Sequence, residues 1–185
     1  MSEHRLLFID TETGGLEPVE HSLFSLGIIV WENGRALFED EIYIKDTVYR
    51  ATAQALAINN INIDYLDKFG LDEQNVVKRI RGIKEQYFNN EIMTVAGHNI
   101  AFDISFIKQL YKKGGYNFTE DFSHRTVDTA SILQFLYFTG KLQKNISSSD
   151  AAFQYFNIDV KKRHTALDDC RATVCLFNEL ILLGN

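Results

Sequence analysis

Two acidic residues near the start of the chain, Asp10 and Glu12, have the type and spacing of a metal-binding pair. They follow the apolar run from Arg5 to Ile9, which predicts a buried strand, and alternate residues of a strand point to the same face. Two carboxylates on one face are unfavourable without a cation, and Mg²⁺ or Mn²⁺ is the natural partner of oxygen ligands. The alternative is a pair of loop acids, one of which caps a turn, and this spacing alone leaves both interpretations open.

A short glycine-rich segment, Thr13-Gly14-Gly15-Leu16, comes directly after these acids. Glycines at this place allow the backbone of a ligand to come close to the chain, because they carry no side chain. Leu16 would then present an apolar edge beside the ligand. The segment therefore favours a binding site at the end of the strand over two unrelated loop acids.

The elements that must position such a site are predicted from hydrophobic periodicity and turn residues. Two strands, 23–31 and 36–44, flank Asn33-Gly34, which is a strong hairpin signal. A short helical segment surrounds Leu56, and a longer helix is expected after Asp72, its N-cap. Further along the chain we expect strands at 91–97 and 126–127, and helices at 100–113, 129–138, 149–156 and 165–183.

This order of elements is typical of an α/β protein with a mixed sheet. The first, fourth and fifth strands alternate with helices and are expected to pair in parallel, while the hairpin adds antiparallel strands at one side. The predicted fold is a mixed five-stranded sheet, with three antiparallel strands and two further parallel strands, flanked by helices. The chain has no internal repeat and only one proline, Pro18, so residues 1–185 are expected to form a single domain.

The composition of the 185 residues, 45% hydrophobic and 24% charged, is that of a globular domain and excludes a disordered chain. A net charge of −6 disfavours a broad basic surface for duplex nucleic acid, although divalent cations at an acidic site would offset part of it. Cys170 and Cys175 lie in one expected helix and are not expected to form a disulfide. No apolar run reaches the roughly 20 residues that span a bilayer, so we expect a cytoplasmic protein without a membrane partner.

Three short motifs stand in order along the chain: Phe8 to Leu16, His98 to Asp103, and His164 to Asp169. Together they resemble the motifs of the DEDDh family of 3′-5′ exonucleases, which includes polymerase proofreading subunits and ribonuclease T. Each motif alone is modest, whereas three in the family's order and at its usual separations are specific. The resemblance extends from Phe8 to about Phe177 and implies a ribonuclease H-like fold, in agreement with the mixed sheet.

The resemblance also implies a role for each polar group of the motifs. Asp10 would bridge two divalent cations, Mg²⁺ or Mn²⁺, while Glu12 and Asp169 would ligate the cation that binds the attacking water. Asp103 would support the second cation. His164 would be the general base, because a neutral imidazole accepts a proton at physiological pH, and the alternative is an ordinary surface histidine.

Two choices within the motifs depend on the family pattern. The metal ligand stands five residues after the motif histidine, which selects Asp169, and Asp168 is expected to be a solvated acid stabilised by the helix dipole. Asn99 and Phe102 would contact the terminal nucleotide, although Phe102 is equally suited to the core. The resemblance implies that Thr13, Gly14 and Leu16 also bind the substrate.

One departure leaves the substrate open. Proofreading relatives often carry Val-His-Gly-Ile ahead of the second motif, whereas this chain has Ile58-Asn59-Asn60-Ile61, and the stretch from Ala55 to Asn59 is more similar to ribonuclease T. The resemblance implies release of nucleoside 5′-monophosphates from single-stranded or frayed 3′ ends of DNA or RNA. The alternatives are an RNA-specific maturation exonuclease or oligoribonuclease, and a catalytically silent nucleic-acid-binding module. A homodimer and a polymerase partner both stay open.

Overall fold

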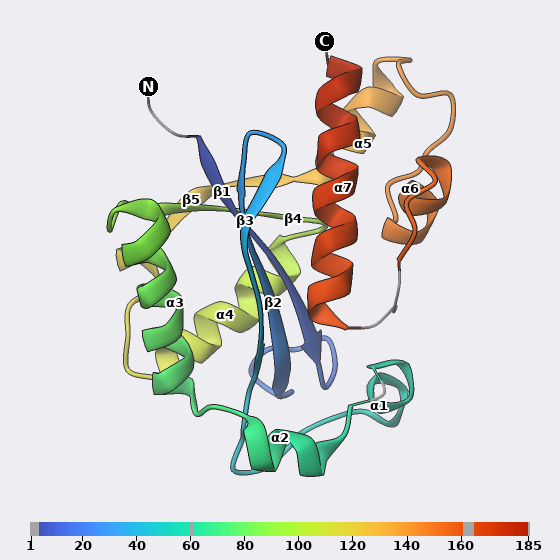
Figure 1. Ribbon diagram of the computed structural model, residues 1–185. Helices are drawn as coiled ribbons and strands as arrows, with labels where there is room; N and C mark the ends of the chain where they lie inside the picture. Colours follow the sequence, from blue (N-terminus) through green and yellow to red (C-terminus); the bar gives the residue numbers. More distant parts are fainter. Residues whose placement is uncertain (1–3, 60, 161–164, 185) are drawn as a thin grey trace.

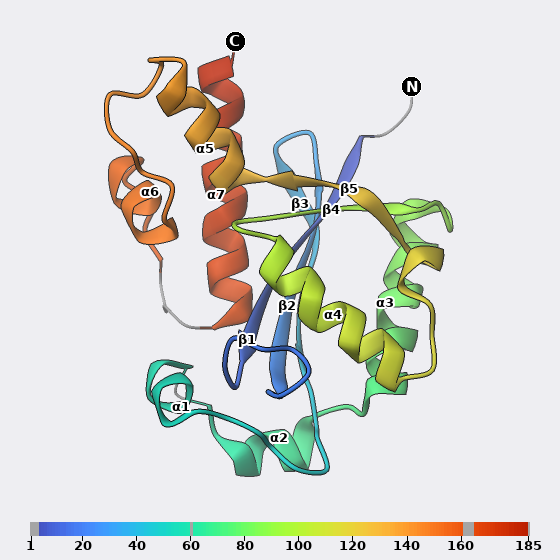
Figure 2. The same ribbon diagram turned by 180° about the vertical axis from the view of Figure 1, so that it is seen from behind.

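The computed structural model describes residues 4–59, 61–160 and 165–184 of the chain. Its centre is a five-stranded sheet in the order β3-β2-β1-β4-β5 (Figures 1 and 2). The strands are β1 Arg5–Thr13, β2 Leu23–Glu32, β3 Arg35–Tyr43, β4 Met93–Gly97 and β5 Phe122–Asp128. β1, β2 and β3 pair antiparallel, whereas β4 and β5 continue the sheet in parallel with β1. The predicted fold class is confirmed.

The hairpin of β2 and β3 forms where the sequence predicts it. Asn33 and Gly34 adopt positive φ values of 49° and 85°, which matches the two left-handed positions of a tight hairpin turn. The two strands place β2 between β3 and β1, so Asp10 pairs with Gly27 and Glu12 with Ser25. The acidic end of β1 is thereby fixed in register against β2.

Helices cover both faces of the sheet (Figures 1 and 2). They are α1 Ala53–Asn59, α2 Ile63–Phe69, α3 Glu73–Phe88, α4 Ala101–Lys113, α5 Thr129–Phe138, α6 Ser149–Tyr155 and α7 Ala166–Gly184, with a short 3-10 helix at Phe118–Glu120. α3 and α4 pack on the face that carries Leu7 and Ile9. α7 packs on the other face, where Cys170 and Val174 belong to the same core cluster as Phe8. Residues alternate between these faces along β1, which is why the two cores meet at this strand.

Three elements differ from the predicted ones, and one of them is the short 3-10 helix at Phe118–Glu120, where the sequence-based prediction has no element. The short helix α2 is missing from the sequence-based prediction, because its seven residues make only about two turns and only Leu66 among them is buried. β5 begins at Phe122 rather than at residue 126, although Ser123 to Thr126 include charged and exposed side chains. Hydrogen bonds to β4 hold this strand where its side-chain pattern is weak.

The two cysteines are both free, as expected, and Cys170 is buried while Cys175 is exposed. Burial raises the pKa of the Cys170 thiol well above its ordinary value. Among the described residues, no helix has the length and apolar character needed to cross a membrane.

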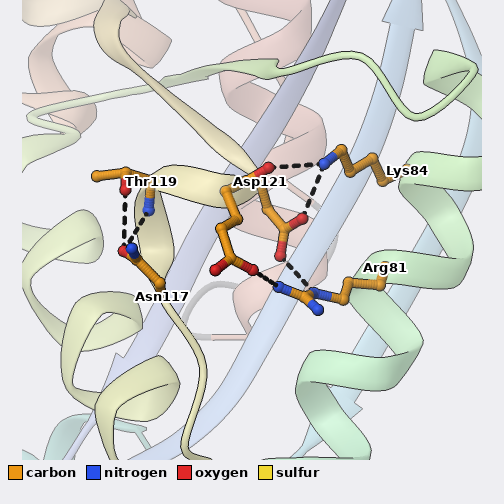
Figure 3. A network of polar contacts seen from close by, with 6 residues as sticks. Arg81, Lys84, Asn117, Thr119 and Asp121 are labelled. Carbon is orange, nitrogen blue, oxygen red and sulfur yellow. Dashed lines mark hydrogen bonds and ion pairs between the residues drawn. The ribbon is translucent and has the colours of Figure 1, made fainter.

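A buried ion network joins α3 to the residue before β5 (Figure 3). The carboxylate of Asp121, 2% exposed, accepts hydrogen bonds from Lys84 Nζ at 2.9 Å and from Arg81 Nε at 2.7 Å. Burial acts to raise the pKa of Asp121, but the hydrogen bonds from these two cations outweigh it and hold the pKa below its usual value. The ion network therefore stabilises the fold above about pH 4, and this contribution is lost as the pH falls through the depressed pKa.

Asp121→Ala is expected to lower the free energy of unfolding by about 3–5 kcal/mol, because buried Lys84 loses its carboxylate partner. Urea unfolding at neutral pH measures the loss. Arg79→Ala is the matched control, since Arg79 pairs with Asp40 through a side chain that is 50% exposed and should cost less than about 1 kcal/mol. Equal losses in the two variants would contradict a special role for the buried network.

Candidate active site

Three carboxylates from two elements converge at the end of β1. Asp10 and Glu12 come from β1 and Asp169 from the first turn of α7, and one oxygen of each lies within 4.8 Å of the others. Glu12 is 6% exposed and Asp169 is 9% exposed. β1 continues through both of its acids, so they share a face as the alternation rule requires.

A glycine in β2 lets α7 approach these acids. Gly27 pairs with Asp10, and a Cβ built on Gly27 would lie 2.2 Å from the carbonyl oxygen of Ala166, the first residue of α7. Because Gly27 has no side chain, the first turn of α7 rests directly on β2 and carries Asp169 to the β1 acids. Gly27 is not among the residues predicted from the sequence, where its only signal is that it is a single glycine inside an apolar strand.

Gly27→Ala is expected to push the first turn of α7 away from β2, because backbone atoms of Ala166 occupy the space of the new methyl group. We expect a loss of about 1–3 kcal/mol in the free energy of unfolding from overpacking. We also expect weaker Mn²⁺ binding, measured by calorimetry, because Asp169 moves with the helix.

Gly82→Ala is the control for this substitution. Gly82 lies within α3 and has no atom within 4 Å of an added Cβ. Alanine there should stabilise the helix by about 0.5–1 kcal/mol. If Gly27→Ala bound Mn²⁺ as tightly as Gly82→Ala, the contact between Gly27 and α7 would not position Asp169.

Asp103 lies close by but outside the group of three carboxylates. It belongs to the first turn of α4 and is 5% exposed, and the Thr11 hydroxyl donates a hydrogen bond to it at 2.7 Å. Thr11 stands between Asp10 and Glu12, so this contact ties α4 to the acidic end of β1. Burial raises the pKa of Asp103 to about 7. A cation beside its carboxylate would oppose that shift, because positive charge favours the ionised form.

Asp168 makes contacts that separate it from its neighbour Asp169. Its carboxylate accepts hydrogen bonds from Arg171 at 2.8 Å and from the Thr165 hydroxyl at 3.2 Å. Arg171 in turn pairs with Glu39 of β3. Asp168 is therefore held in an ion pair within α7, through an arginine that also contacts β3, rather than being a simple solvated acid, while Asp169 joins the β1 acids.

His164 lies outside the described residues, as do Lys161 to Arg163. Its role as general base stays a prediction from the sequence. The described part of the third motif begins at Thr165, directly before α7.

The glycine-rich segment after Glu12 forms a tight loop. The Thr13 hydroxyl donates to the Gly15 carbonyl at 2.8 Å, and Gly14 N donates to the Ser22 carbonyl at 2.8 Å. A Cβ on Gly14 would lie 2.2 Å from the Arg50 carbonyl oxygen, so glycine is needed for this close packing. Leu16 is 77% exposed and is available to a ligand at the rim.

The second motif places Asn99 and Phe102 at the start of α4. Asn99 has a positive φ of 56°, and its backbone N–H donates to the Asp128 carboxylate at 2.8 Å. The Phe102 ring lies 5.1 Å from the Phe106 ring and packs against the core, so at least part of Phe102 serves packing. Both ring nitrogens of His98 contact other groups, the Thr129 hydroxyl and the Ser147 carbonyl, as a structural histidine does.

The donor set of the three carboxylates fits a divalent cation. All the candidate ligand atoms are carboxylate oxygens, which are hard donors, and their negative charges gather within one small, largely buried space. Such a set is suited to a hard cation and not to a soft metal that prefers sulfur.

Comparison with known proteins places the chain in a family. The exonuclease family RNase_T matches residues 7–177. DNA polymerase III PolC-type of Listeria welshimeri is 30% identical over 172 residues, which cover 93% of this chain and 11% of that protein. The chain thus spans about a tenth of the length of this polymerase. Ribonuclease T of Haemophilus ducreyi is 27% identical over 192 residues, which cover 95% of this chain and 84% of that protein.

A solved structure agrees with the fold. E. coli exonuclease I in complex with a dT13 oligonucleotide has a TM-score of 0.82 at 16% identity, covering 96% of this chain and 41% of that one. This similarity shows a shared fold. Because the RNase_T family matches nearly the whole chain, and the chain has the mixed sheet expected of it, the protein belongs to the RNase_T family of exonucleases with a ribonuclease H-like fold.

Proposed function

We propose that this chain is a metal-dependent 3′-5′ exonuclease that releases nucleoside 5′-monophosphates from single-stranded or frayed 3′ ends. The observation that carries the proposal is the convergence of Asp10, Glu12 and Asp169 in a chain of an exonuclease family. A fold alone does not establish an activity, whereas a group of hard ligands at one end of the sheet has a specific chemical use. We further propose that residues 1–185 act as one exonuclease domain.

Asp10, Glu12 and Asp169 would hold one divalent cation, and Asp103 together with Asp10 would hold a second. The cations, Mg²⁺ or Mn²⁺, supply positive charge where the attacking and leaving oxygens become negative. We propose that a ring nitrogen of His164 accepts the proton of the attacking water. The water oxygen then bonds to phosphorus, the bond from phosphorus to the 3′ oxygen of the preceding nucleotide breaks, and that oxygen takes a proton from solvent to become the new 3′-hydroxyl.

The substrate is proposed to be a single strand, because the fold neighbour exonuclease I binds a dT13 oligonucleotide. Thr13, Gly14 and Leu16 on the loop after β1 would contact the terminal nucleotide, together with Asn99 and Phe102 on the other side. Leu16, the most exposed of the apolar groups in this set, would lie against the terminal base. Similarity to a PolC-type polymerase favours DNA and an association with a polymerase.

A second candidate is an RNA-specific exonuclease. The observation that favours it is the match to ribonuclease T, which covers 84% of that protein, against 11% of the PolC-type polymerase. The chemistry would be the same in both cases. The two candidates differ only in whether the 2′-hydroxyl of the substrate is tolerated or required.

Single-stranded DNA and RNA of equal sequence, labelled at the 3′ or the 5′ end, test the proposal. With Mg²⁺ or Mn²⁺ we expect labelled mononucleotide at once from 3′-labelled substrate, and a ladder of shortened products from 5′-labelled substrate. Chelator should stop both reactions. The DNA-to-RNA rate ratio decides between the two candidates, and binding without any cleavage would favour the silent nucleic-acid-binding module instead.

A further inference from the structure

We propose that Asn59, the last residue of α1, is a positioning residue that holds α1 beside the carboxylates so that it can receive the 3′ end of the substrate. This inference rests on the proposed exonuclease function. The first observation is a hydrogen bond of 2.8 Å from Asn59 Nδ2 to the carbonyl oxygen of Thr13, which directly follows Glu12. The side chain of Asn59 therefore joins α1 to the strand end that carries the proposed metal ligands.

A second hydrogen bond fixes the other end of α1. The backbone N–H of Thr52, just before α1, donates to the Gly14 carbonyl at 2.7 Å. Thr13 and Gly14, adjacent in the chain, thus accept one bond from each end of the helix. The pairing of β1 with β2 becomes irregular between Glu12 and Thr13, so these carbonyls are turned away from the regular ladder.

Apolar burial contributes little to holding α1 in place. None of its seven residues is buried, and Leu56 and Ile58 are 40% and 44% exposed. The Thr52 contact comes from the backbone and survives any side-chain change, which leaves Asn59 as the side-chain contact that a substitution can remove. Its loss should allow α1 to move relative to β1.

The location of α1 indicates how the hydrogen bond between Asn59 and Thr13 would help substrate binding. α1 lies below the first turn of α7 and beside the end of β1 in both views (Figures 1 and 2). It carries two half-exposed aliphatic side chains, Leu56 and Ile58, near the same loop that carries exposed Leu16. The base and sugar of a terminal nucleotide present apolar surface that such side chains can cover.

The substrate binds more tightly when α1 is already fixed in place than when α1 becomes ordered only on binding. Ordering a loose segment consumes part of the binding free energy, so KM rises. The rate of the bound substrate depends on the carboxylates and should change little, because β1 and α7 are joined by the sheet core. Loss of the Asn59 side-chain hydrogen bond is therefore expected to raise KM and to leave kcat nearly unchanged.

The test compares three substitutions of Asn59 and one control substitution in the full chain, with Mn²⁺ and a single-stranded oligonucleotide. Asn59→Ala and Asn59→Asp both remove the N–H donor, and each should raise KM about 3- to 10-fold, the size of one lost hydrogen bond, with kcat within about twofold. Asn59→His retains a ring N–H and should restore most of the wild-type KM. Gln86→Ala, at an exposed position of α3, is the control and should leave both constants unchanged.

An unchanged KM in Asn59→Ala would overturn the proposal, as would equal behaviour of Asn59→Asp and Asn59→His. A fall in kcat that parallels the rise in KM would also overturn the proposal, because it would show that Asn59 only supports the structure in general. The dissociation constant of a fluorescent single-stranded oligonucleotide, measured in chelator, should shift by the same 3- to 10-fold without any turnover. Absence of turnover in the wild type would thus refute the proposed exonuclease function. The dissociation constant would still test the proposed role of Asn59 in that case.

Discussion

Asp10→Asn is expected to reduce nucleotide release by about 10³-fold or more. Asparagine has the shape of aspartate but removes one negative charge from the three-carboxylate group. Metal ions contribute several kcal/mol to catalysis through the charge that they supply, and a factor of ten in rate corresponds to about 1.4 kcal/mol. The initial rate with saturating Mg²⁺ and a 3′-labelled oligonucleotide measures the loss.

The fold of Asp10→Asn must be intact for this result to have meaning. Asp10 pairs with Gly27 through its backbone, which the substitution leaves unchanged, so the urea midpoint should lie close to the wild-type value. Calorimetric titration with Mn²⁺ should show weaker binding in the same sample. A well-folded variant with the wild-type rate would remove Asp10 from the site.

His164→Ala is expected to lower the rate by about 10²- to 10⁴-fold, the usual contribution of a general base. Its metal affinity should match that of the wild type, because the three clustered carboxylates are retained. Measuring both the rate and the Mn²⁺ affinity of each variant therefore distinguishes the two roles. Asp10→Asn should lose both, whereas His164→Ala should lose only the rate.

His124→Ala is the matched control for the histidine. His124 is an exposed residue of β5 and belongs to none of the three motifs. Its substitution should leave the rate unchanged. If His164→Ala were as active as His124→Ala, the proton acceptor would be another group.

The acidic pair, the hairpin and several helix ends could be predicted from local signals. Asp10 and Glu12 share a face because β1 is a regular strand through both, and Asn33-Gly34 turns the chain where two strands meet. Asp72 accepts a hydrogen bond from the backbone of Asn75 at 2.8 Å, as an N-cap residue does. These features depend on neighbours in the sequence, which is why they could be predicted.

Features that depend on contacts between distant segments could not be predicted. Gly27 matters because Ala166 lies over it, and Thr11 because Asp103 reaches it from α4. Asn59 matters because the Thr13 carbonyl is within its reach. The spacing of residues in the sequence carries no information on these contacts, since each joins elements that meet only in the folded chain.

The most direct test of the central claim compares two adjacent residues of α7. Asp169 joins Asp10 and Glu12, whereas Asp168 is paired with Arg171. With the metal-dependent release of mononucleotides from a 3′-labelled strand as the measurement, Asp169→Asn should lose at least about 10³-fold in rate. Asp168→Asn should stay within about threefold of the wild type, since a partly exposed ion pair is worth little. Equal losses in both variants, or a larger loss in Asp168→Asn, would contradict the assignment of the metal site.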